Sequence, residues 1–199
     1  MSEDHTHVQE FFGARADGWD RKFPEDGPAF GTAVAEFGLR PGDRVLDAGC
    51  GTGRALTALR AAVGPSGKVL GADLTPQMLA AAQRAGRAAE GVLLLADVAR
   101  LPLRDGVLDA VFAAGLIAHL PDPEANLREL ARVVRPGGRL AIFHPIGRAA
   151  LAARHGRELT PDDLRAEPNL RPLLARSGWD VISYADEDAR FLVLAVRGS

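Results

Sequence analysis

A chain of 199 residues is long enough for one domain that buries most of its apolar surface without disulfides or metals. Hydrophobic residues make up 47% and charged residues 25%, the proportions of a soluble globular protein. The net charge of −2, the single Cys50 and the lack of a long apolar run argue against nucleic-acid binding, disulfide-linked secretion and membrane insertion. We therefore expect a cytoplasmic protein without a signal peptide, bound metal or nucleic-acid partner.

Strand and helix patterns alternate between residues 28 and 145. Apolar runs predict strands over 44–49, 68–73, 92–96, 108–115 and 139–145. Helical spacing and end signals, such as Gly38 after the first helix and Thr75-Pro76 before the third, predict helices over 28–38, 54–63, 76–90 and 126–135. This alternation indicates parallel strands joined by right-handed crossovers in a doubly wound sheet.

The last fifty residues follow a different pattern. A helix is predicted to open at residues 160–163 and to end near Gly178. Two strand-like runs follow, over 179–184 and 189–196, separated only by an acidic turn. Strands this close together must pair antiparallel. We expect one domain with a helical lid (1–40), a cofactor-binding core (41–145) and a C-terminal helix and hairpin (146–199).

The most informative segment is VLDAGCGTGR, residues 45–54, in which an acid and three alternating glycines follow a buried strand. Glycines allow a backbone to approach a ligand more closely than any Cβ would permit. The next strand ends on Asp73, and an acid at that place can hold both hydroxyls of a ribose. The pair predicts a nucleoside cofactor.

Four segments in order resemble the class I S-adenosylmethionine (SAM)-dependent methyltransferases, especially the small-molecule group that includes the ubiquinone and menaquinone C-methyltransferases. They are VLDAGCGTG, GADLTPQML, LLADVARLPL, and LDAVFAAGLIAHLPD with the later RVVRPGGRLAIF. The resemblance covers residues 45–143, about half of the chain. It implies a Rossmann-like α/β fold with a seven-stranded, mostly parallel sheet ending in an antiparallel hairpin.

The resemblance also implies roles for individual residues. Asp47, Gly49, Gly51 and Gly53 would form the loop beneath the methionine part of SAM. Residues around the nucleoside would include Asp73 at the ribose and, near the adenine, Leu74, Met78, Asp97 and Val98. Ala114 would offer a carbonyl near the SAM amino group, and Trp19 would wall the pocket. Met78 and Trp19 could instead be packing residues, and Cys50 is interpreted as a buried filler.

The implied reaction transfers a methyl group from SAM to a small-molecule carbon, oxygen or nitrogen acceptor and leaves S-adenosylhomocysteine (SAH). A general base is needed only if the acceptor is not already ionised. His119 and His144 are the candidates because both follow strands at the sheet edge where ligands bind. A packing role is favoured for His119. Arg148, Arg154, His155 and Arg157 form a basic run that is either a solvated face or an anion site.

Three alternatives stay open on the sequence. An NAD-dependent oxidoreductase would need a glycine or alanine at Arg54. A catalytically silent SAM-binding or partner-binding protein would explain the short acceptor region over 145–159, and aminopropyl transfer would use the same cofactor. The acceptor is not specified, and the protein is expected to be a monomer or a homodimer.

Overall fold

The computed structural model describes residues 3–198, with the side chains of 3–5 and 25 excepted. Seven strands form one sheet in the order β3-β2-β1-β4-β5-β7-β6. The strands are β1 (Arg44–Ala48), β2 (Lys68–Asp73), β3 (Val92–Leu95), β4 (Leu108–Ala114), β5 (Val134–His144), β6 (Trp179–Glu187) and β7 (Arg190–Arg197). The α-helices are α1 (Glu3–Gly13), α2 (Trp19–Lys22), α3 (Gly27–Phe37), α4 (Leu56–Val63), α5 (Pro76–Arg84), α6 (Pro123–Val133), α7 (Arg148–Arg154) and α8 (Glu167–Arg176).

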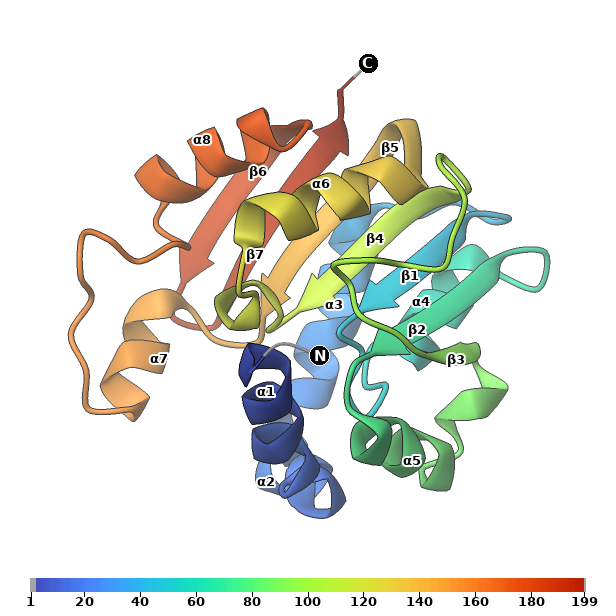
Figure 1. Ribbon diagram of the computed structural model, residues 1–199, viewed down its shortest axis with the longest axis horizontal. Helices are drawn as coiled ribbons and strands as arrows, with labels where there is room; N and C mark the ends of the chain where they lie inside the picture. Colours follow the sequence, from blue (N-terminus) through green and yellow to red (C-terminus); the bar gives the residue numbers. More distant parts are fainter. Residues whose placement is uncertain (1–2, 199) are drawn as a thin grey trace.

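The strand directions confirm the predicted fold class. Strands β3, β2, β1, β4 and β5 run parallel, whereas β7 is antiparallel to both β5 and β6. The chain reverses direction across the sheet between β1 and β4, and in open α/β sheets ligands bind beyond the carboxyl ends of the strands at such a point. Figure 1 shows α1 and α2 lying across these ends, with α7 beside them.

Helices cover both faces of the sheet because successive strand residues point to opposite sides. Leu46 packs with α6 and α8 in one core, and its neighbour Val45 packs with α3 and α4 in the other. Trp179 is 1% exposed and its indole Nε1 donates a 3.0 Å hydrogen bond to the Leu127 carbonyl, which fixes the hairpin against α6. Rigid packing on both faces holds the strand ends in place.

Most predicted element boundaries move by a few residues. The helix predicted over 76–90 ends at Arg84 because Gly86 adopts a left-handed conformation, with φ of +75°. The helix predicted over 126–135 instead begins at Pro123, since Asp122 caps it by accepting the Ala125 amide hydrogen bond. Thr75 lies at the N-cap of α5 and is buried, but its side chain makes no capping bond.

The C-terminal helix prediction is wrong at its start. Residues 160–166 form turns, and α8 begins only at Glu167. Asp163 does not cap a helix, because its carboxylate accepts from the Arg165 amide and pairs with Arg148 of α7. The short helix α7 itself was not predicted.

Candidate active site

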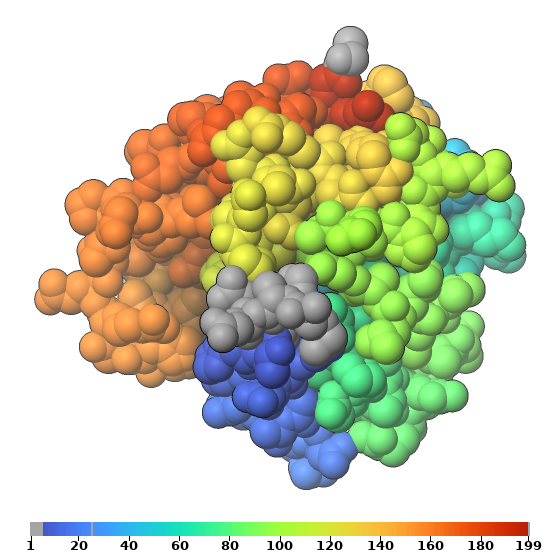
Figure 2. Space-filling view, viewed as in Figure 1, coloured from blue at the N-terminus to red at the C-terminus, as the bar shows by residue number. Residues whose placement is uncertain are grey.

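One cavity of about 580 Å³ lies at the carboxyl ends of the parallel strands, a volume within the range of about 300–1,000 Å³ usual for small-molecule sites. The carboxyl ends of the strands form its floor, and the N-terminal segment and α7 form its walls. In Figure 2 these two walls, coloured blue and orange, lie side by side along the lower edge of the molecule. The cavity brings together all the predicted cofactor residues except Gly53: Trp19, Asp47, Gly49, Gly51, Asp73, Leu74, Met78, Asp97, Val98 and Ala114.

The glycine loop after β1 is shaped by left-handed backbone. Gly49, Gly51 and Gly53 have φ values of +67°, +54° and +79°, a region that side chains with a Cβ rarely adopt. A Cβ on Gly49 would lie 2.9 Å from Cδ1 of Leu116. Gly53 does not line the cavity and turns the chain toward α4. The loop therefore exposes backbone to the cavity at Gly49 and Gly51.

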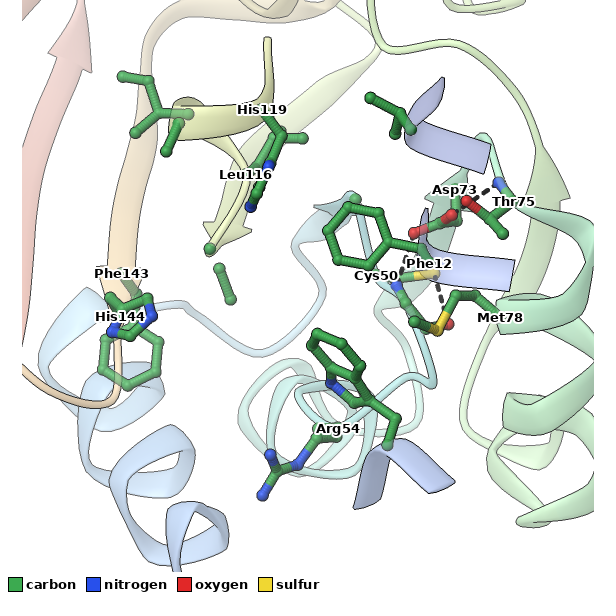
Figure 3. Close-up of a pocket in the computed structure, with 18 of the residues that line it drawn as sticks. Phe12, Cys50, Arg54, Asp73, Thr75, Met78, Leu116, His119, Phe143 and His144 are labelled. Carbon is green, nitrogen blue, oxygen red and sulfur yellow. Dashed lines mark hydrogen bonds between the residues drawn. The ribbon is translucent and has the colours of Figure 1, made fainter. Parts of the chain in front are cut away.

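Asp73 ties the end of β2 to this loop. Its Oδ2 accepts a 2.8 Å hydrogen bond from the Gly51 amide, and its Oδ1 accepts a 2.7 Å bond from the Thr75 amide. These bonds lower the pKa of the carboxyl, but burial outweighs them and the pKa is raised overall. Figure 3 shows Asp73 and Thr75 on the opposite side of the cavity from His144.

Asp47 at the end of β1 is 2% exposed. Burial, and then the charge of Asp73, raise the pKa of Asp47 well above its ordinary value. Among the described residues no cationic side chain pairs with it. A buried acid and a half-buried acid beside a glycine cradle fit a ligand that carries both a positive charge and hydroxyl donors, which is the chemistry of SAM.

The other predicted cofactor residues line the same half of the cavity. Met78 is 2% exposed and also lines the cavity. Its side chain is therefore part of both the packed interior and the cavity wall. Asp97 is half-buried and its Oδ1 accepts a 2.8 Å hydrogen bond from the Ala99 amide. Cys50 is buried, and its burial raises the pKa of the thiol so that the unreactive protonated form dominates.

The N-terminal segment covers the cavity with aromatic rings. Trp19 makes edge contacts with Phe12 and Phe23, with ring centroids 5.6 and 5.3 Å apart. Asp20 ties this segment to the glycine loop through Thr52 Oγ1 (2.6 Å) and to Arg87 (2.6 Å). Trp19 therefore both walls the cavity and packs the segment.

Arg54 is turned away from the glycine loop toward the N-terminal segment. Its guanidinium donates to the Phe23 carbonyl at 2.6 Å and pairs with Asp26 at 3.3 Å. Arg54 thus holds the N-terminal segment against the glycine loop. It occupies the position where an NAD-binding motif would need a glycine or alanine.

Replacing Arg54 with methionine is expected to loosen the N-terminal segment. The variant loses two half-buried hydrogen bonds, each worth about 1.5–3 kcal/mol because the donor is charged. Amide hydrogen exchange within α2 should therefore accelerate more than tenfold. Arg84→Met is the control, since its exposed pair with Asp17 reaches the same segment and should contribute little. Equal exchange in both variants would contradict the tether.

The two candidate histidines lie in the other half of the cavity. The Nδ1 atom of His144 is 2.9 Å from the Ile146 carbonyl, so Nε2 is the nitrogen left for a ligand. Burial lowers the pKa of His144, so the ring is neutral at neutral pH. His119 packs edge-on against Phe12 with centroids 5.1 Å apart, which supports the packing role. Figure 3 shows His119 descending from the β4 end.

The basic run after β5 divides in the structure. Arg148 turns away to Asp163 and Asp186, at 3.1 Å from each, whereas Arg154, His155 and Arg157 line the cavity. Sequence reasoning missed Arg165, which also lines it. Nothing in the residues around Arg165 indicates a site, because its position depends on how the loop after α7 folds back.

Comparison with known proteins finds methyltransferases among the relatives and structural neighbours of this chain. The model of a family described as a methyltransferase domain matches residues 46–142. An arsenite methyltransferase from Halobacterium salinarum is 29% identical over 175 residues, 79% of this chain and 42% of that protein. A demethylmenaquinone methyltransferase from Staphylococcus aureus is 38% identical over 106 residues, 53% of this chain and 44% of that protein.

A solved structure of a SAM-dependent methyltransferase from Aquifex aeolicus superposes with a TM-score of 0.70 and 28% identity, covering 83% of this chain and 88% of that one. The chain spans less than half the length of the two curated relatives.

A doubly wound sheet with a reversed hairpin and a glycine-and-acid cradle at its switch point defines a nucleoside-cofactor protein. The methyltransferase-domain match over residues 46–142, the methyltransferase relatives and the structural likeness support a class I SAM-dependent methyltransferase with SAM as its cofactor. This assignment decides against the NAD-dependent alternative. No helix within residues 3–198 is long and apolar enough to cross a membrane.

Proposed function

We propose that the protein transfers a methyl group from SAM to a small-molecule acceptor. The observation that carries the proposal is the division of one cavity into two halves. One half holds the acids Asp47 and Asp73, and the other extends past His144 to α7. A donor held in the first half faces an acceptor held in the second. The covering aromatic residues separate both from water, which favours reaction between aligned partners.

The chain's own residues would divide the work of holding the cofactor. Asp47 supplies a buried negative charge for the cationic methionine part, and Asp73 supplies acceptor oxygens for the ribose hydroxyls. Leu74, Met78 and Val98 offer apolar contacts for the adenine. When bound, SAM supplies a methyl group on a positively charged sulfur. No protein nucleophile is required, which suits a cavity whose single cysteine is protonated.

The test of the proposal is methyl transfer itself. The purified protein is incubated with SAM carrying a radiolabelled methyl group and a panel of phenols, quinols, amines and thiols. Label should move to at least one acceptor, and Asp73→Ala should abolish the transfer. Tight SAH binding without transfer to any panel member would favour the catalytically silent alternative and contradict the proposal.

His144 is proposed to accept a proton from acceptors that are not already ionised. His144→Ala should lower kcat by about 10²–10⁴-fold with a phenol acceptor and leave SAH affinity unchanged. His7→Ala, at an exposed position of α1, is the control. In the wild type, kcat should fall only below the ordinary histidine pKa of about 6.5, because burial lowers the pKa of His144. An unchanged kcat in His144→Ala would exclude this role.

A further inference from the structure

Two groups of charged residues in the cavity lining come from different segments of the chain. The acids Asp47, Asp73 and Asp97 lie at or just beyond the carboxyl ends of β1, β2 and β3 in the cofactor half. The arginines of the acceptor half come from α7 and the chain after it: Arg154, Arg157 and Arg165. Asp26 also lines the cavity, but it is paired with Arg54. Among the described residues, no acid faces these three arginines from the cavity lining.

Arg165 carries the charge that lies deepest in this half. Its side chain is only 17% exposed, and its Nε lies 3.4 Å from Oδ1 of Asp163. The other oxygen of Asp163 pairs with Arg148 at 3.1 Å. Arg148 has a second acidic partner in Asp186 at 3.1 Å, so the longer contact with Asp163 is the one ion pair that Arg165 makes among the described residues. The ion pair uses Nε of Arg165 and leaves the two terminal nitrogens for another acceptor.

The loop that carries Arg165 is held in place. The Tyr184 hydroxyl of β6 donates a 2.7 Å hydrogen bond to the Arg165 carbonyl, and Asn169 of α8 donates to the Asp163 carbonyl at 2.9 Å. A guanidinium on a fixed loop loses less side-chain freedom when it binds a ligand than one on a free surface. A solvated arginine would not need these anchors.

The positive charge extends to the place where methyl transfer is proposed. Burial is the main reason that the pKa of His144 is lowered, and the charges of Arg165 and Arg154 lower it further. Burial and then Arg165 likewise lower the pKa of His119. The charge of Asp26 acts in the opposite direction on His144, and Arg165 lines the same cavity as both histidines.

The walls around these arginines are apolar. Leu151 of α7 and Phe191 of β7 line the same half, and Phe191 is 1% exposed. Burial of apolar ligand surface against such walls favours binding. The half-cavity is thus complementary to a molecule with an apolar body and a negative end.

We propose that the methyl acceptor carries an anionic group, a carboxylate or a phosphate, that Arg165 binds, with Arg154 and Arg157 at the cavity mouth and the apolar body against Leu151 and Phe191. This inference rests on the proposed methyl transfer and names the chemical class of its substrate. A guanidinium suits either anion because its planar donors can bind two oxygens at once.

The experiment uses calorimetry to compare how an anion and its neutral counterpart bind to protein that is saturated with SAH. The probes are benzoate against benzamide, 1-naphthoate against 1-naphthamide, and phenyl phosphate against phenol. At least one anion should bind the wild type about 10- to 100-fold more tightly than its neutral partner. Arg165→Met should remove that difference and keep its SAH affinity. If benzoate or 1-naphthoate binds most tightly, the acceptor's anionic group is a carboxylate; if phenyl phosphate does, it is a phosphate.

Two further variants control for folding and for general charge. Arg165→Lys keeps the charge without the planar fork and should retain part of the preference. Arg171→Met removes the same charge from an exposed position of α8 and should retain all of it. Equal binding of each anion and its neutral partner, no anion binding at millimolar concentration, or an unaffected Arg165→Met variant would overturn the inference. If the wild type did not bind SAH, that result would instead contradict the proposed function.

Discussion

Asp47→Asn is expected to make the ligand-free protein more stable and at the same time to weaken its binding of SAM. The Asp47 carboxylate is 2% exposed and has no cationic partner among the described residues, so its charge is costly to bury. Removing the charge should raise the free energy of unfolding by about 1 kcal/mol or more. For a chain of this size, each kcal/mol raises Tm by about 2–4 °C.

The pH dependence follows from the direction of the pKa shift. Because the pKa of Asp47 is raised in the folded protein, the folded state binds its proton more tightly than the unfolded chain does. Stability of the wild type is therefore lost as the pH rises from about 4, the ordinary carboxyl value, through the raised pKa. The Tm advantage of Asp47→Asn should grow over that window and then level off.

SAM binding should change in the opposite direction. Loss of a charged partner for the cationic methionine part should weaken SAM binding about 10- to 100-fold. Differential scanning calorimetry and titration with SAM measure the two effects on the same samples. Asp180→Asn, at an exposed position of β6, should change neither value. An Asp47→Asn variant that is less stable than the wild type without ligand would contradict this account of Asp47.

Asp73→Ala is expected to reduce SAH affinity by about 100-fold or more, the largest loss at the site. The substitution removes the proposed acceptor for the ribose hydroxyls and frees the Gly51 and Thr75 amides that the carboxylate holds. Hydrogen bonds to a charged group contribute about 1.5–3 kcal/mol each. Titration calorimetry with SAH measures the effect, and Asp180→Ala is the control on an exposed strand position.

Asp73→Asn separates charge from geometry. Both carboxylate oxygens accept backbone N–H groups, and an amide can supply only one acceptor oxygen. The asparagine variant should therefore lose nearly as much SAH affinity as the alanine variant, although it has almost the same shape. Wild-type affinity in Asp73→Asn would show that the ribose is held elsewhere.

Local sequence patterns account for the geometry of the acid-lined half of the cavity. Alternating glycines after an apolar strand allow left-handed backbone there, and Gly49 and Gly51 adopt it. Asp73 ends the neighbouring strand, and parallel pairing of β1 with β2 brings that strand end beside the glycine loop. Both features depend only on residues that are close in the sequence and on the single crossover connection from β1 to β2.

The acceptor half depends on contacts between distant segments, so the sequence offered His144 and the basic run after β5 as candidates but not Arg165. Arg165 reaches the cavity because Asp163 turns back to Arg148 and because β6 holds the loop through Tyr184. The TPDD pattern over 160–163 favoured a helix start, but the ion pair of Asp163 with Arg148 competes with helix capping there. Arg54 likewise has its role only because the N-terminal segment folds over the glycine loop.

The most direct test of the central claim, that the acid-lined half holds the cofactor, is a crystal structure of the protein with SAH. We predict the ribose hydroxyls at Asp73, the methionine amino group on the Asp47 side, and the sulfur facing the half that contains His144 and Arg165. SAH ordered at another surface, or with its ribose turned away from Asp73, would contradict the account.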